Sequence, residues 1–281
     1  MIDSHESSYR WHSIQVIQER SSQSRLWGMG VFATMAIAFL ISSILLVNSI
    51  RYTELNLVMI EDQPLLIPIF VAGILVALYL AMLAAISVSR ELDKGTLETL
   101  LYGPVDEISF ILGTFLAHVK VFFYTLVVAL IWSNFCVWIL NLSFKLDVLG
   151  LLLVSFMMAT ELIAFGVFSA IWGGKARNAL IYFILIIVFI GGVQVADLVI
   201  SGLVQINTAT ISDPMILVRN ILAKAAGFTS WISPFTQAQR AMQAMVGHVY
   251  GDFFRNLGLM LMECGVLIAG AILLFKKKGV R

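Results

Sequence analysis

The chain has 281 residues, is 60% hydrophobic, has a mean hydropathy of +0.94 and carries a formal net charge of +1. A soluble core of this size does not need so much apolar sequence, and the apolar residues gather in runs of about 20, the length that crosses a bilayer as a helix. The near-zero net charge creates no overall field toward nucleic acid. These properties exclude a soluble globular domain and predict an all-α, polytopic membrane protein whose partners include the lipid bilayer but no nucleic acid.

Residues 1–25 are predicted to form an N-terminal amphipathic interfacial helix, ahead of a six-span transmembrane domain over residues 26–281. Trp11, Ile14 and Ile17 recur at helical spacing among basic residues. Such a pattern is typical of a helix that lies along the membrane surface. The segment contains no apolar run of the kind found in a cleavable signal peptide, so none is expected.

Six apolar runs are long enough to cross a bilayer, and Lys120 and His118 are expected at the headgroup level before the third of them. Between the fifth and sixth runs, Asp213-Pro214 and Ser233-Pro234 are helix-start signals. The two helices that they predict are too short or too polar to span. They are either re-entrant or interfacial helices that close a pathway, or a lid packed on the bundle. The predicted spans cover residues 26–47, 64–88, 121–140, 148–172, 179–203 and 257–275.

Basic residues in the connections between spans predict the orientation, because Lys and Arg favour the cytoplasmic side. With the N-terminus inside, eleven basic residues lie on the inner side and six on the outer side. Six spans with both termini in the cytoplasm follow. The inner set is Arg10, Arg20, Arg25, Arg90, Lys94, Lys175, Arg177, Lys276, Lys277, Lys278 and Arg281, and the outer set is Arg51, Lys145, Arg219, Lys224, Arg240 and Arg255.

A compact block of charge, Ser89 to Pro104, separates the second and third apolar runs. On a helix, Glu91, Lys94 and Glu98 share one face, with leucines on another. Gly95 permits a close approach. The block therefore predicts a short amphipathic helix that lies on the cytoplasmic membrane surface and can receive a push from a soluble partner. The alternative is a solvated loop.

The motifs of common catalytic chemistry are absent from the sequence. Gly173-Gly174-Lys175 lacks the first glycine of a P-loop and is followed by Ala176. The four histidines have no ligand spacing, and Cys136 and Cys264 form no framework. We therefore expect no metal site, no nucleotide site and no enzymatic activity on this chain.

Four polar residues within the apolar runs are candidate functional groups, because ionisable side chains in a membrane must face protein or water. Glu161 lies near the middle of the fourth span and Glu263 in the outer third of the sixth. Asp197 and Gln194 lie near the outer end of the fifth span, beside a glycine pair. These groups form either a polar path or ion relay, or protonated carboxyls that hydrogen-bond to neighbouring helices.

The charged block resembles the type-2 ABC exporter permeases, the six-span membrane subunits of ATP-binding-cassette transporters. That family has a charged E-x-x-x-G-T-L-E-x-L-L-x-x-P run after its second span. Leu112-Gly113 also resembles the Leu-Gly-Lys that opens the family's third span, with Thr114 in place of the lysine. The residues that match the charged run are Glu91, Gly95, Thr96, Leu97, Glu98, Leu100, Leu101 and Pro104.

The resemblance implies that two such subunits pair, as a homodimer or with a related paralogue, and that each docks on a separate ATPase subunit. It implies export across the plasma membrane, no cofactor on this chain, and ATP and Mg on the partner. The path between the two copies would be lined by spans 1, 2 and 5, which includes Gln194 and Asp197. The expected coupling residues are Arg90, Glu91, Lys94, Gly95, Thr96, Glu98 and Pro104.

Two other functions remain open from the sequence. One is an ion-coupled secondary transporter that uses Glu161, Asp197 or Glu263 as a proton relay. The other is a non-transporting membrane subunit that transmits ATPase work to an outer partner.

Overall fold

The computed structural model describes residues 10–21, 28–56, 64–93, 106–141, 147–206 and 213–278. Within these ranges the regular structure is all α-helical, as predicted, and starts with a helix over residues 10–21. Six later helices are long and apolar enough to cross a membrane, namely α2, α3, α5, α6, α7 and α10. The bounds are α2 (Met29–Asn56), α3 (Leu66–Asp93), α5 (Glu107–Leu140), α6 (Asp147–Gly173), α7 (Ala176–Ile206), α8 (Asp213–Ile232), α9 (Pro234–Val246) and α10 (Tyr250–Lys278).

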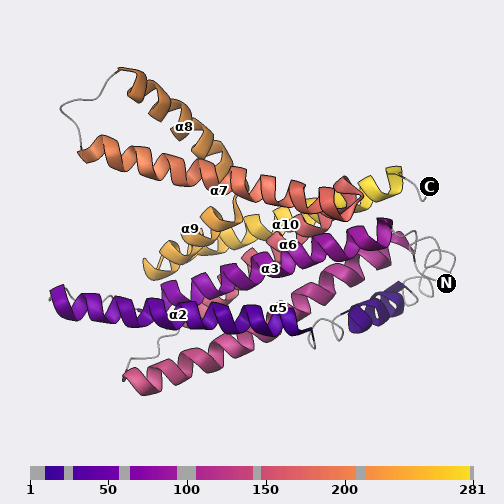
Figure 1. Cartoon of the computed structure of the whole chain (residues 1–281), viewed down its shortest axis with the longest axis horizontal. Helices are drawn as coiled ribbons and strands as arrows, with labels where there is room; N and C mark the ends of the chain where they lie inside the picture. Colours follow the sequence, from indigo (N-terminus) through magenta and orange to yellow (C-terminus); the bar gives the residue numbers. More distant parts are fainter. Residues whose placement is uncertain are drawn as a thin grey trace.

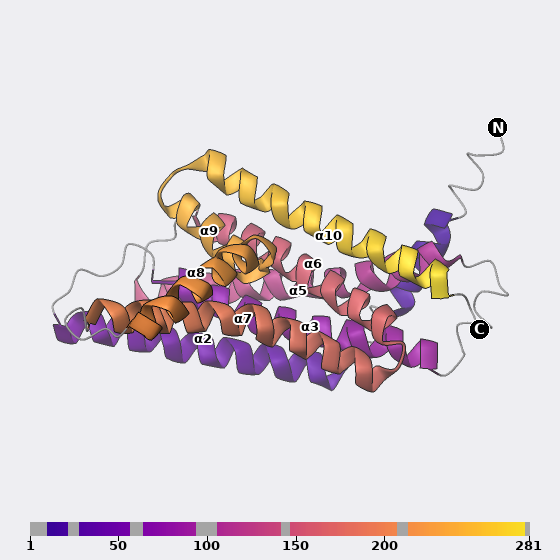
Figure 2. The ribbon, with the colours of Figure 1, turned by 90° about the horizontal axis from the view of Figure 1, so that it is seen from above.

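The six long helices run roughly along one common axis (Figure 1). Helix 10–21 and the last turns of α10 lie at the same end of the bundle, which is called the terminal end below; the opposite end is the distal end. The view from above separates α10, along one edge, from α2, along the other (Figure 2). The long helices thus alternate in direction along the chain, as six successive crossings require.

α6 is the central helix of the bundle. It packs against α3, α5, α7, α9 and α10, and its contact with α3 is the most extensive. Small residues permit this approach: a Cβ on Gly166 would collide with the carbonyl oxygen of Ala81 and lie 2.9 Å from its carbonyl carbon. Close backbone contact at small residues is how helices associate in a bilayer, where apolar side chains gain nothing by leaving lipid.

The helix that contains the third candidate span begins earlier than the predicted span, at Glu107. α5 runs unbroken from Glu107, and His118 is fully buried, with Nδ1 2.8 Å from the carbonyl oxygen of Thr114. The polar residues of this first half made it resemble a surface segment. Because small and apolar residues recur on one face, that face packs into the bundle, and His118 lies on it.

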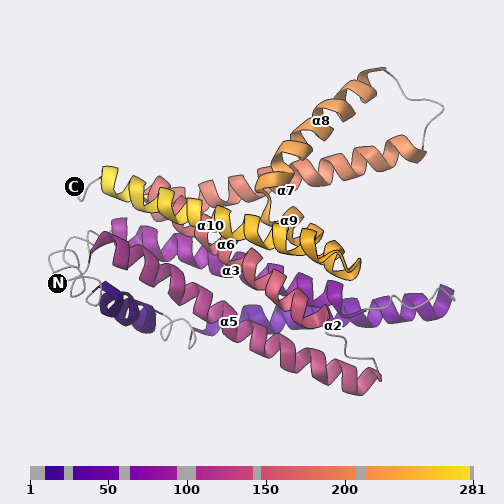
Figure 3. The ribbon, with the colours of Figure 1, turned by 180° about the vertical axis from the view of Figure 1, so that it is seen from behind.

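Between α7 and α10 the chain forms a helical hairpin of α8 and α9 (Figures 1 and 3). Ser233 is fully buried and caps α9 by accepting a hydrogen bond from the amide of Thr236, and Pro234 occupies the first turn. This confirms the predicted helix start. α9 packs against both α6 and α10. α9 is therefore part of the bundle, whereas α8 packs chiefly against α7 and diverges from the other helices (Figures 1 and 3).

Candidate functional site

The charged block begins inside α3. Arg90, Glu91 and Asp93 form the last turn of this helix, where Arg90 and Asp93 are exposed and Glu91 is half-buried. Leu92 packs against the hydrophobic core, so the turn is attached to the bundle. These charges project from the terminal end as a rigid continuation of a core helix.

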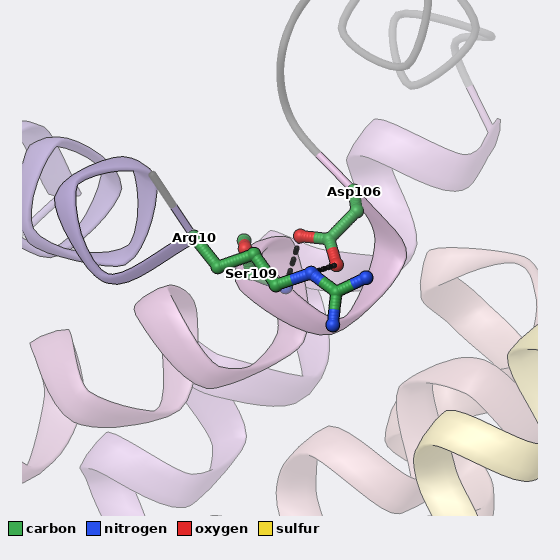
Figure 4. Close-up of polar contacts among 3 residues, drawn as sticks. All are labelled: Arg10, Asp106 and Ser109. Carbon is green, nitrogen blue, oxygen red and sulfur yellow. Dashed lines mark hydrogen bonds and ion pairs between the residues drawn. The ribbon is translucent and has the colours of Figure 1, made fainter. Parts of the chain in front are cut away.

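The remainder of the predicted coupling helix, including Lys94, Gly95, Thr96, Glu98 and Pro104, lies outside the described residues. The structure resumes at Asp106, the N-cap of α5. Its Oδ1 accepts a hydrogen bond from the amide of Ser109 at 3.1 Å, and its Oδ2 lies 3.4 Å from Nε of Arg10 (Figure 4). One carboxylate thus starts α5 and contacts helix 10–21.

Helix 10–21 packs along the beginning of α5. Ile14 is buried, and a Cβ on Gly113 would lie 2.8 Å from the Cβ of Ile17 and 3.1 Å from the carbonyl oxygen of Ile14. Gly113 therefore permits the close approach of the two helices. Trp11, which the sequence places on the same face as these isoleucines, is 59% exposed in the single chain.

The Arg10–Asp106 pair is exposed to water, with 55% and 35% of the two side chains accessible. Ion pairs of this kind contribute only about 0–1 kcal/mol, because water screens them and two side chains lose freedom. The pair therefore adds little to the stability of the fold. The charged residues at this end are together called the terminal-end charges: Arg10, Arg90, Glu91, Asp93 and Asp106.

A second polar group lies in the middle of the bundle, between α6, α9 and α10. Glu161 is fully buried, and its carboxyl group interacts with that of Glu263. Gln237 donates from Nε2 to Oε1 of Glu263 at 2.7 Å and also to the carbonyl oxygen of Trp231. Glu161, Gln237 and Glu263 are called the Glu161 cluster below.

Glu161 and Glu263 lie at matching depth. The helix rise from each of these residues to the last apolar residues of its own helix, at the terminal end, is roughly 18 Å at about 1.5 Å per residue. A hydrocarbon core is about 30 Å thick, which puts both carboxyls near its middle if those residues mark the boundary. The turn of the α8–α9 hairpin, next to Gln237, reaches the same level.

Gln194 and Asp197 both lie on α7. The amide nitrogen of Gln194 is buried without a hydrogen-bond partner among the described residues, and the side chain of Asp197 lies outside them. The glycine pair Gly191 and Gly192 has open space where a Cβ would stand, so no helix among the described residues uses the close approach that it permits. α7 is also the most exposed candidate span.

Sequence reasoning missed three residues that the structure brings into these sites. Asp106 could have been recognised as an N-cap, because an aspartate directly before Glu107 and a helical apolar pattern is a helix-start signal. Gln237 lies in the first turn after Ser233-Pro234, but nothing in the sequence indicates its partner on α10. Arg10 was counted only for orientation.

Within the described ranges, no group of three or more His, Cys, Asp and Glu residues is arranged to hold a metal ion. Residues 12–280 match the family model described as ABC-2 family transporter protein, which is nearly the whole chain. No protein with a curated description matches it.

Proposed function

Because the chain belongs to the ABC-2 family of transporter membrane proteins, we propose that it is the permease subunit of an exporter in the plasma membrane, driven by a separate ATPase subunit. The family and the multi-pass architecture establish a membrane subunit of an ABC-2-type transporter. The direction of transport, the membrane and the partner are our inference. ATP and Mg²⁺ would bind to the partner, because the sequence of this chain has no P-loop.

The observation on which this proposal depends is the arrangement of the terminal end. The last turn of α3 and the N-cap of α5 flank residues 94–105 on both sides, and helix 10–21 lies against α5 beside them. Both flanking turns belong to core helices. A soluble subunit that bound this segment would therefore contact the ends of two core helices, α3 and α5. ATP-driven closure of that subunit could then shift the bundle between two conformations.

Pairing with a second copy is supported by α7. Its glycine pair has no packing partner in the part of the chain that the structure describes, and its apolar surface is exposed there. Glycines at an unpacked helix face suit a close contact with another helix in a membrane. We propose that two copies meet near α7 and that Gln194 and Asp197 line the path between them.

Charge reversal at Glu98 tests the coupling assignment. We expect Glu98→Lys to lower co-purification with the partner ATPase, and ATP-driven transport in vesicles, at least about tenfold. Like-charge juxtaposition at an interface costs several kcal/mol, and each 1.4 kcal/mol is a factor of ten. Expression and membrane insertion should not change. Asp252→Lys, an exposed reversal at the distal start of α10, is the matched control and should retain both activities.

Normal transport and normal ATPase binding by Glu98→Lys would remove the coupling assignment. Transport that continues without any ATPase, and that depends instead on an ion gradient, would favour the ion-coupled alternative. The Glu161 cluster is the observation that supports this second candidate, because paired carboxyls within membrane spans commonly relay ions.

A further inference from the structure

The Glu161 cluster has more hydrogen-bond acceptors than donors. Both N–H groups of the Gln237 amide are used, by Glu263 and by the carbonyl oxygen of Trp231, which fixes the orientation of the amide. Four buried oxygens then have no donor among the described residues: both oxygens of Glu161, Oε2 of Glu263 and Oε1 of Gln237. Glu161 is fully buried and Gln237 is 1% exposed.

The helices packed around Glu161 contain few titratable or charged groups that could supply a donor. α10 contributes Glu263 and Cys264, and the Cys264 thiol is directed at the carbonyl oxygen of Thr160. The basic residue of α9, Arg240, donates to Ser230 at 2.8 Å. α5 contributes His118, with Nδ1 on Thr114. α3 between residues 66 and 89 and α7 between 178 and 196 contain no Asp, Glu, His, Lys or Arg.

Two carboxyl groups that face each other away from water do not both ionise, because like charges repel and neither is solvated. A proton on one carboxyl removes a charge and supplies the missing donor to the other. We propose that the Glu161 cluster is a proton-binding site that fastens the α8–α9 hairpin to α6 and α10, and that loss of the proton releases the turn of the hairpin.

The hairpin is the element that responds because Gln237 belongs to it. Gln237 follows the Ser233 cap and links the hairpin turn, through the carbonyl oxygen of Trp231, to Glu263 on α10. A second carboxylate charge in the cluster would repel the first and draw in water, which competes for the Gln237 amide. The polar link between the hairpin and the bundle would then be lost.

α9 also offers a route for proton exchange. One side of this helix packs on α6 and α10, and the other presents polar side chains that are exposed or half-exposed in the single chain. Polar groups at this depth are costly against lipid, so this side suits a water-lined path from the distal end. These polar residues are Thr236, Gln239, Arg240 and Gln243.

The experiment uses the full chain in lipid nanodiscs without any ATPase, so its result is independent of the proposed coupling. A spin label at Ile232→Cys, on the exposed part of the hairpin turn, reports mobility in a background with Cys136→Ala and Cys264→Ala. We expect an immobilised label at acidic pH and a mobile one at alkaline pH. In Glu161→Gln the amide supplies the donor permanently, so the label should stay immobilised at both pH values.

Asp252→Asn, which removes an exposed carboxylate at the start of α10, is the control and should keep the pH transition. Infrared difference spectra of the unlabelled protein should show a protonated-carboxyl band that Glu161→Gln or Glu263→Gln removes. The proposal is overturned if the Glu161→Gln label keeps a normal pH transition, or if the band is absent from the wild type. It is also overturned if sodium or potassium restores immobilisation at alkaline pH, which would identify a metal ion as the ligand.

Discussion

The terminal-end charges and the Glu161 cluster differ chiefly in their access to water. At the terminal end, Arg10 and Asp106 form an ion pair of which both members are partly exposed, and Arg90 and Asp93 project from the last turn of α3. In the cluster, Glu161 and Gln237 are sealed within three helices. Substituting an exposed charge of the first kind should change the stability of the fold little, so we expect such charges to act through a partner. Substituting a buried group of the second kind should change the stability of the fold itself.

Rigid packing connects the two regions. α3 extends from the terminal-end charges into the core, where Ala81 touches Gly166 on α6, and α6 also contains Glu161. Interiors packed at this density move as units or switch between discrete arrangements rather than deforming smoothly. The comparison therefore predicts large effects on stability near α6 and small ones at the terminal end.

Gly166→Ala should produce the largest loss of stability. The added methyl group would collide with the Ala81 carbonyl group, which belongs to a helix backbone and cannot rotate away. Overpacking of this kind typically costs about 1–3 kcal/mol, and a fixed backbone neighbour places the expected loss at the upper end. Thermal unfolding in detergent, followed by circular dichroism, measures it.

Gly113→Ala is the matched control, because its methyl group meets the Ile17 side chain of a peripheral helix. Helix 10–21 can shift where α3 cannot. We expect a near-normal unfolding temperature but faster tryptic cleavage after Arg20. Equal destabilisation by the two alanines would show that helix 10–21 is as firmly packed as the core, and the contrast between the regions would fail.

Gln237→Leu should have an intermediate effect on stability. Leucine retains most of the side-chain volume but leaves Glu263 and the carbonyl oxygen of Trp231 without their donor. An unsatisfied buried polar group costs about 1–3 kcal/mol. Gln243→Leu, on the exposed side of the same helix, should change stability by less than about 0.5 kcal/mol. Denaturant or thermal unfolding of both variants tests whether burial decides the difference.

The sequence predicted most of the fold, because each signal involved was local. Six apolar runs became six candidate spans, and Ser233-Pro234 became a helix start. The errors occurred where tertiary packing overrode a local pattern. The third helix looked shorter because polar residues precede the third run, yet its first half packs inward from Glu107.

The candidate sites were less predictable because their partners are distant in sequence. Glu161 and Glu263 were recognised individually, since a carboxyl in an apolar run is unusual. Their pairing, and the contribution of Gln237, depend on how α6, α9 and α10 converge, and no short-range pattern encodes that. The same limit applies at the terminal end, because Arg10 pairs with Asp106, a residue that is far from it in the sequence.

The smallest effect is expected from Asp106→Asn, which separates the two contacts of this residue. Asparagine keeps an oxygen to cap the Ser109 amide but removes the charge opposite Arg10. The loss should be less than about 1 kcal/mol and should shrink further in high salt, because the pair is exposed. Asp106→Ala removes the cap as well and should cost about 1 kcal/mol more.

A double mutant tests what positions helix 10–21. If Asp106→Asn and Arg10→Ala have equal, non-additive effects on tryptic cleavage after Arg20, the ion pair alone sets the position of this helix. Additive effects would mean that each residue stabilises this helix through a different contact, and the terminal end would then depend on its own packing more than on exposed charge.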